Sequence, residues 1–170
     1  MVALGDNTGW CTLKKMRALG IDFGLRRIGL ALSDPTGLLA RPWKTIARRG
    51  ELKAVADELA RAIIELRDED DGLSAVVLGL PRRLSGDPTD LTPTVSALAG
   101  RLKTLTNVPV ILQDERLSSR EAESLLARRE KDWRKRKADL DAASAAVILQ
   151  DYLDVSVASR PPAVEDDHQS

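Results

Sequence analysis

The chain has 170 residues, with 26 basic and 26 acidic side chains and therefore no formal net charge. That balance argues against a protein that coats nucleic acid without specificity, and no apolar run approaches the roughly 20 residues needed to cross a bilayer. The length is typical of one domain that buries a proper core, and we expect it in the cytoplasm with no membrane partner.

The N-terminal part predicts a leader followed by three strands. Residues 1–15 show no periodicity and no signal-peptide core, so we expect a flexible leader. It contains Cys11, the single cysteine, which could form a disulfide only between molecules. Residues 17–23, 28–33 and 38–46 predict strands whose short connections, such as the Asp34–Gly37 turn, indicate antiparallel pairing.

The middle of the chain alternates helical and strand patterns. Residues 51–66 and 92–106 place apolar side chains on one helical face, with Leu105 among those expected inward. Residues 75–80 form a continuous apolar run, as expected for a strand buried on both sides. A loop rich in Gly, Pro and Asp follows, and residues 110–112 predict a fifth strand that leads into Asp114 and Glu115.

The C-terminal part predicts two helices and a tail. Ser118 and Glu121 form a capping box that opens the first helix. We expect a loop at the charged stretch 130–138, a helix over 140–153 and a disordered acidic tail over 156–170. The resulting order predicts an α/β domain over 16–155: a mixed five-stranded sheet, three antiparallel strands then two parallel ones, with helices on both faces.

Carboxylates occur where such a sheet gathers ligands, near its strand ends. Asp22 closes the first strand, Asp114 and Glu115 close the fifth, and Asp141 opens the last helix. Neighbouring strand residues point to opposite faces, so only one of Asp114 and Glu115 can join a given site. Clustered carboxylates raise one another's pKa, and Mg²⁺ or Mn²⁺ relieves that repulsion. Two such ions about 4 Å apart activate water against a phosphodiester.

Each acid also has a plainer interpretation. Asp141 could favour a helix N-terminus through the helix dipole. Asp114 could accept hydrogen bonds from backbone amides at a strand end. Asp22 could pair with Arg26 or Arg27 across the turn that follows it.

Basic side chains are candidates for contacts with a nucleic-acid backbone, although solvated surface charge is the alternative for each. The candidates lie in turns or in the basic run between residues 128 and 137: Arg26, Arg27, Arg82, Arg83, Arg134, Lys135, Arg136 and Lys137. Trp133, inside that run, could stack on a base, whereas Trp43 is expected to pack.

Taken together, four stretches resemble the YqgF family, also called RuvX, of Holliday junction resolvases in the RNase H-like superfamily. They are Gly20–Gly24 with Ile28-Gly29, Val77–Pro81 with the Gly86 loop, Asp114–Ser119 with Glu121-Ala122, and Asp141–Ala145. They occur in the family's order between residues 17 and 153.

The resemblance implies an RNase H-like fold and metal-dependent phosphodiester hydrolysis. It selects Asp22, Glu115 and Asp141 as catalytic and metal-binding residues, preferring Glu115 to Asp114. Ser144 stands where related resolvases carry another acid, so the number of ions stays open. Arg116 would either neutralise developing charge or pair with a neighbouring acid.

The resemblance leaves the substrate open between the ends of precursor 16S rRNA and branched DNA. Junction resolution needs two symmetric cuts and predicts a homodimer, whereas RNA processing could proceed in a monomer. A non-catalytic nucleic-acid-binding module is the alternative of another class, and the three acids argue against it. The sugar kinase, heat-shock and actin ATPases share the opening hairpin but need a second domain that 170 residues do not hold.

Overall fold

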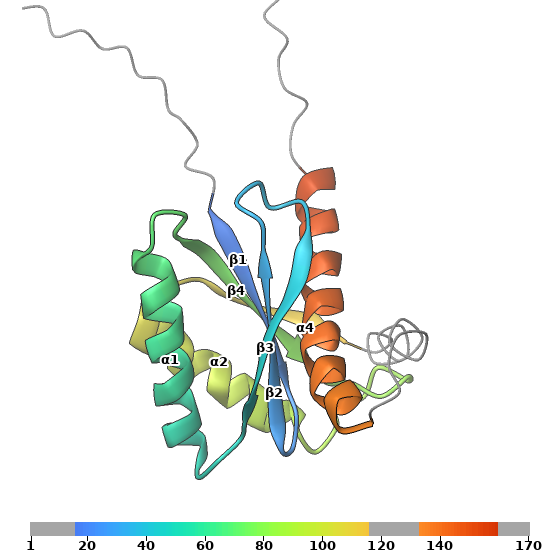
Figure 1. The fold of residues 1–170 in the computed structure, drawn as a ribbon. Helices are drawn as coiled ribbons and strands as arrows, with labels where there is room; N and C mark the ends of the chain where they lie inside the picture. Colours follow the sequence, from blue (N-terminus) through green and yellow to red (C-terminus); the bar gives the residue numbers. More distant parts are fainter. Residues whose placement is uncertain (1–15, 116–132, 160–170) are drawn as a thin grey trace, which may run out of the picture.

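The architecture comes from a computed structural model that describes residues 16–115 and 133–159, with the side chains of 133–138 excepted. It contains five strands and three long helices in this part of the chain (Figure 1). In chain order they are β1 (Arg17–Phe23), β2 (Arg27–Ser33), β3 (Ala40–Ala47), α1 (Leu52–Asp68), β4 (Leu73–Leu80), α2 (Thr92–Thr106), β5 (Val110–Asp114) and α4 (Trp133–Ala158).

All five strands belong to one mixed sheet with the order β3-β2-β1-β4-β5. The tight connections from β1 to β2 and from β2 to β3 give antiparallel pairs. The helices α1 and α2 act as crossovers, so β4 pairs parallel to β1 and β5 parallel to β4. The predicted fold class is therefore confirmed.

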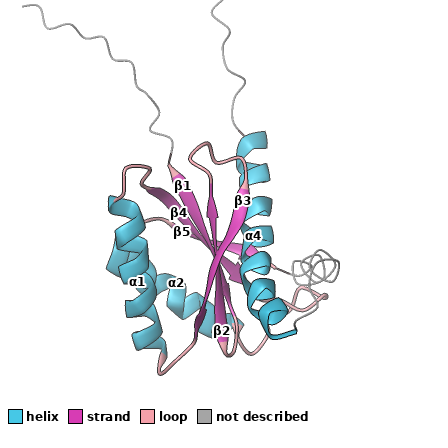
Figure 2. Ribbon diagram, viewed as in Figure 1, coloured by secondary structure: helices cyan, strands magenta, loops and turns pink. Residues whose placement is uncertain are grey.

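The two faces of the sheet are covered differently. Figure 2 shows α1 and α2 on one face and α4 alone on the other. The layer under α1 and α2 is the larger core, built from fully buried aliphatic side chains such as Ile21, Leu59, Ile63, Leu78 and Leu98. Because large aliphatic groups bury the most apolar area, this layer contributes most of the hydrophobic stabilisation.

The layer under α4 is built from small residues. It includes Ala18, Ala31 and Ala145, with Ile148 and Leu149 filling the remaining space. A Cβ atom added to Gly20 would lie 2.7 Å from the carbonyl oxygen of Ala145, closer than real Cβ contacts allow. The helix backbone therefore rests directly on the sheet, which brings its short side chains to those of the strands.

Two element predictions need correction. First, α4 begins at Trp133, so the charged stretch expected to be a loop is partly helical, and the helix extends to Ala158, into the first residues of the predicted tail. Second, Leu105 is 45% exposed. The buried stripe of α2 runs through Leu98 and Leu102 to Thr106, and Leu105 lies beside that stripe.

Within the described ranges, no helix is long and apolar enough to cross a membrane. The helix predicted to open at Ser118, and Cys11, lie outside the described residues.

Candidate active site

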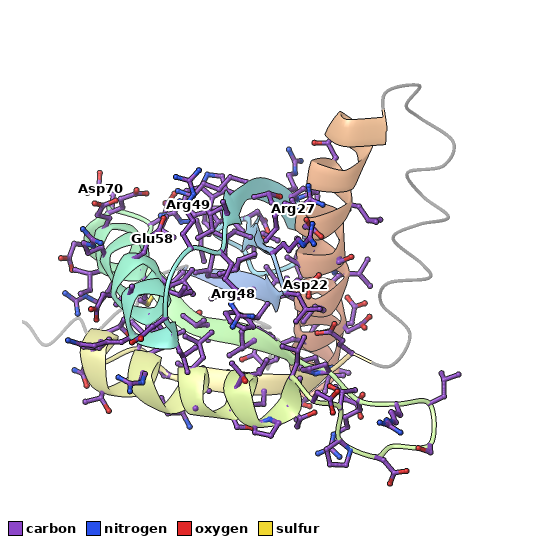
Figure 3. All side chains as sticks on the ribbon, turned by 90° about the horizontal axis from the view of Figure 1, so that it is seen from below. Asp22, Arg27, Arg48, Arg49, Glu58 and Asp70 are labelled. Atoms are coloured by element: carbon purple, nitrogen blue, oxygen red, sulfur yellow. The ribbon has the colours of Figure 1, made fainter. Side chains whose placement is uncertain are left out.

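Asp22 lies on β1, on the face covered by α4. Its partner on β2 is Gly29, and the preceding residue on the same face of β1 is Gly20. The neighbours Ile21 and Phe23 point the other way, into the core under α1 and α2. Strand alternation therefore directs a carboxylate toward α4, and Figure 3 shows Asp22 beside that helix.

Asp141 comes to the same place from α4. A Cβ atom on Gly29 would overlap the main chain of Asp141, so the backbone of this residue sits directly over β2. Asp141 lies eight residues after Trp133, the first residue of the helix. The helix dipole acts on the first turn only, so the interpretation of Asp141 as an N-terminal stabiliser is wrong.

The two carboxyl groups interact. Burial, and then the charge of Asp141, raise the pKa of Asp22 from 3.8 to about 7. Loss of water is the larger cause of this shift, and the negative charge of Asp141 adds to it. The structure thus brings together two residues that are 119 positions apart (141 − 22) in the sequence.

Glu115 supplies a third carboxylate from the end of β5. Gly79 pairs with Gln113, and Glu115 follows two residues later on the same face. A Cβ atom on Gly79 would overlap the Glu115 carboxylate and lie 2.7 Å from Ile148, so the glycine makes room for this side chain. Asp114 is exposed and belongs to the opposite face.

The electrostatics of Glu115 join it to the same cluster. Burial is the main cause that raises its pKa from 4.5 to about 8, followed by the charges of Asp22 and Asp114. Of the two acids at the end of β5, the structure therefore places Glu115 next to Asp22 under α4.

Arg27 places a cation at this site. Its Nε atom lies 2.9 Å from Oδ2 of Asp141, and both side chains are partly buried. Oδ2 is shielded from solvent and receives no aligned hydrogen bond, so the contact is an ion pair by proximity. The pairing of Asp22 with Arg26 or Arg27 that the sequence allowed is not seen: Arg27 pairs with Asp141, and Arg26 is exposed.

The donor types of this cluster fit a hard divalent cation. Three carboxylates offer the oxygen ligands that Mg²⁺ and Mn²⁺ prefer, and a cation would relieve the repulsion that raises the pKa values. In the part of the chain described here, however, no three acidic, histidine or cysteine side chains are arranged to hold a metal as they stand. The position three residues after Asp141 holds buried Ser144, so α4 adds no further carboxylate there.

The loop after β4 presents two of the predicted phosphate contacts. Arg82 and Arg83 are exposed and lie in a loop held by its own hydrogen bonds. The Arg82 guanidinium donates to the carbonyl of Gly86 at 2.9 Å, and the Arg83 amide donates to the carbonyl of Asp87 at 2.9 Å. These hydrogen bonds within the loop fix the backbone that carries both arginines.

Other predicted contacts fall outside the described side chains: Arg116, Arg134, Lys135, Arg136, Lys137 and the stacking candidate Trp133.

Arg48 is a residue that the sequence analysis did not identify. Its amide donates to the carbonyl of Arg26 at 2.9 Å, and its guanidinium donates to the carbonyl of Gly24 at 3.4 Å. The guanidinium also lies 4.5 Å from the centre of the Phe23 ring. Arg48 therefore fastens the turn between β1 and β2, on the side of the sheet that Phe23 faces. The contact could not be read from the sequence, because it depends on the register of β3 against β2, in which Ala47 pairs with Arg27.

Comparisons with known proteins address the family and the fold of this chain. The family model RuvX, described as Holliday junction resolvase, matches residues 16–155. A relative from Anaeromyxobacter dehalogenans with the provisional name pre-16S rRNA nuclease is 42% identical over 82% of this chain and 97% of its own length. A relative of the same name from Geobacillus kaustophilus is 37% identical over 82% of this chain and 98% of its own.

Solved structures share the fold. The RuvC protein of T. thermophilus in complex with a Holliday junction substrate aligns with a TM-score of 0.50 and 16% identity, over 84% of this chain and 96% of that one. The Fowlpox virus resolvase in complex with Holliday junction DNA aligns with a TM-score of 0.53 and 12% identity, over 84% of this chain and 99% of that one.

Proposed function

Because this chain belongs to the RuvX family of Holliday junction resolvases, we propose that it is a nuclease that hydrolyses phosphodiester bonds with the help of Mg²⁺ or Mn²⁺. The observation that supports this most is the convergence of Asp22, Glu115 and Asp141 under α4, with the pKa values of the first two raised to about 7 and about 8. Buried, mutually repelling carboxylates are typical of sites that accept a cation.

We propose that the substrate is precursor 16S rRNA and that the enzyme acts in the cytoplasm. The support is the shared name of relatives that align over nearly their whole length. In this role the enzyme trims precursor ends during ribosome assembly and can work as a monomer.

The chain's own residues divide the work. Asp22, Glu115 and Asp141 would hold the metal ion, which supplies an activated water and charge neutralisation at the leaving oxygen. The packing of α4 on glycine positions keeps the three side chains close and partly removed from bulk water. Arg26, Arg82 and Arg83 are exposed, and they bind the phosphate backbone without reading bases.

Resolution of branched DNA is the second candidate. It is favoured by the family description and by the fold shared with two proteins solved on Holliday junctions. This activity requires paired cuts and therefore a homodimer, which separates it from RNA processing by a simple mass measurement.

The test compares the full chain with Asp22→Asn on two substrates, a precursor 16S rRNA fragment and a four-way DNA junction. In Mg²⁺ the wild type cleaves the RNA, EDTA abolishes cleavage, and the variant loses roughly 10³-fold or more of the rate while its melting temperature holds. If the wild type cleaves only the junction and is a dimer, the second candidate, resolution of branched DNA, replaces the first. Undiminished cleavage by pure Asp22→Asn would overturn the metal mechanism, and the absence of cleavage and of metal binding would leave a binding module.

A further inference from the structure

The ion pair between Arg27 and Asp141 occupies a ligand position of the proposed metal site. Nε of Arg27 lies 2.9 Å from Oδ2 of Asp141, with side-chain exposures of 30% and 27%. A cation thus stands against one of the three carboxylates that would bind the metal. The pair is sheltered enough for the attraction to exceed that of a surface pair.

Arg27 serves one acid of the cluster selectively. Among the described residues, burial and neighbouring acids raise the pKa of Asp22 and of Glu115, and Arg27 is not one of the causes. A guanidinium placed to neutralise the whole cluster would lower those pKa values. The protein instead directs its charge to Asp141, the ligand contributed by the helix.

The backbone explains this choice. Arg27 is the first residue of β2 and pairs with Ala47. It shares the α4-facing side of the strand with Gly29, over which the main chain of Asp141 lies. The guanidinium therefore reaches the Asp141 side chain from the β1–β2 turn, and Figure 3 shows Arg27 beside α4.

The same pair bears on how the metal site is completed. No three acidic, histidine or cysteine side chains among the described residues are arranged to hold an ion as they stand, although Asp22 interacts with both other acids. An Asp141 carboxylate that is held by Arg27 is not fully available to Mg²⁺. For a metal to use Oδ2 of Asp141, the guanidinium has to move to another acceptor.

A phosphodiester is such an acceptor, because guanidinium groups bind phosphate oxygens in bidentate fashion. Arg27 lies at the turn that also carries exposed Arg26, where a substrate backbone can approach. We propose that Arg27 is a positioning residue that engages Oδ2 of Asp141 in the free protein and leaves it to the metal when a substrate phosphate takes the guanidinium. This inference rests on the proposed nuclease function and names how its site is loaded.

The consequence is a thermodynamic coupling between metal and substrate. If the substrate phosphate draws Arg27 from Asp141, substrate tightens metal binding, and metal must tighten substrate binding by the same factor. Metal capture is thereby favoured when a nucleic acid is present.

The first measurement is calorimetric titration of the full chain with Mn²⁺, without nucleic acid. Arg27→Gln should bind Mn²⁺ about 3- to 10-fold more tightly than wild type, because the competing cation is gone. Arg41→Gln removes an exposed arginine of β3 and the same charge, and it should bind Mn²⁺ like wild type. An Arg27 that merely supports the fold predicts weaker binding, and unchanged or weaker binding in Arg27→Gln overturns the inference.

The second measurement is the affinity for a precursor 16S rRNA fragment, and for a four-way DNA junction, in EDTA. Arg27→Gln should lose about 3- to 10-fold in affinity for the nucleic acid that the wild type binds. Unchanged affinity would overturn the proposal that the Arg27 guanidinium moves to a substrate phosphate. Arg27→Lys keeps the charge, so its Mn²⁺ affinity should stay near wild type, which separates charge from folding defects. If wild type binds Mn²⁺ no better than Asp22→Asn, the proposed function itself fails; if only the Arg27 effects are missing, this inference alone fails.

Discussion

The two faces of the sheet follow opposite packing rules. Under α1 and α2, large aliphatic side chains are wholly buried and separate the helices from the strands. Under α4, Gly20, Gly29 and Gly79 bring the helix into direct contact with the strands. The face under α1 and α2 buries most of the apolar area. The face under α4 buries less, because its small residues let the helix approach and bring the carboxylates together. Stability and chemistry are thus assigned to separate layers, and substitutions on each face should have different signatures.

Leu98→Ala should produce the largest loss of stability. Leu98 is fully buried in the layer under α1 and α2, and removing its side chain should lower the free energy of unfolding by about 3 kcal/mol. The cleavage rate per folded molecule should not change, because the α4 face is untouched. Urea denaturation and rate assays below the transition check both statements, and a rate loss in the fully folded variant would contradict the separation of the faces.

Gly29→Ala should affect stability and activity together. Its new methyl group overlaps the main chain of Asp141, so α4 must shift, at a cost of about 2 kcal/mol. Because Asp141 moves with the helix, we expect cleavage to fall at least about tenfold in the folded variant. Full activity with a normal melting temperature would contradict the close packing of α4 against β2 at Gly29.

The metal-free protein should lose stability as the pH rises from about 5 to about 8. The folded pKa values of Asp22 and Glu115, about 7 and about 8, lie above the ordinary 3.8 and 4.5. The folded chain therefore binds more protons than the unfolded chain in this window, and its advantage fades as the two groups ionise. Since the groups are coupled and partly exposed, the total change is on the order of 2 kcal/mol.

Denaturation at several pH values measures this slope. The double variant Asp22→Asn, Glu115→Gln should flatten it, and so should Mg²⁺. Asp34 does not interfere: hydrogen bonds from Thr36, Leu39 and Leu38 lower its pKa to about 2, so its contribution is lost only in stronger acid. A slope that persists in the double variant would assign it to other groups.

Gly100→Ala should have the smallest effect and the opposite sign. Gly100 lies within α2, and a Cβ atom there meets nothing within 4 Å. Alanine in a helix interior is favoured over glycine by about 0.8 kcal/mol, so the variant should be slightly more stable and fully active. It is the matched control for Gly29→Ala.

The sheet and the acids of its α4 face followed from local patterns in the sequence. Connection lengths determined the strand directions, and strand alternation limited the fifth-strand site to one of Asp114 and Glu115.

Other features depend on tertiary register and were not predictable. Arg27 reaches Asp141 because β2 passes beneath α4, and Arg48 reaches the carbonyl of Arg26 because β3 pairs with β2. The early start of α4 and the exposure of Leu105 were also missed.

The central claim is that Asp22, Glu115 and Asp141 share one metal ion when the site is loaded. Anomalous diffraction from crystals grown with Mn²⁺ and nucleic acid tests it most directly. The account predicts a peak within about 2.5 Å of carboxylate oxygens of all three residues, with Arg27 turned from Asp141 to a phosphate. A bound ion that contacts none of these carboxylates, in crystals of a catalytically active preparation, would contradict it.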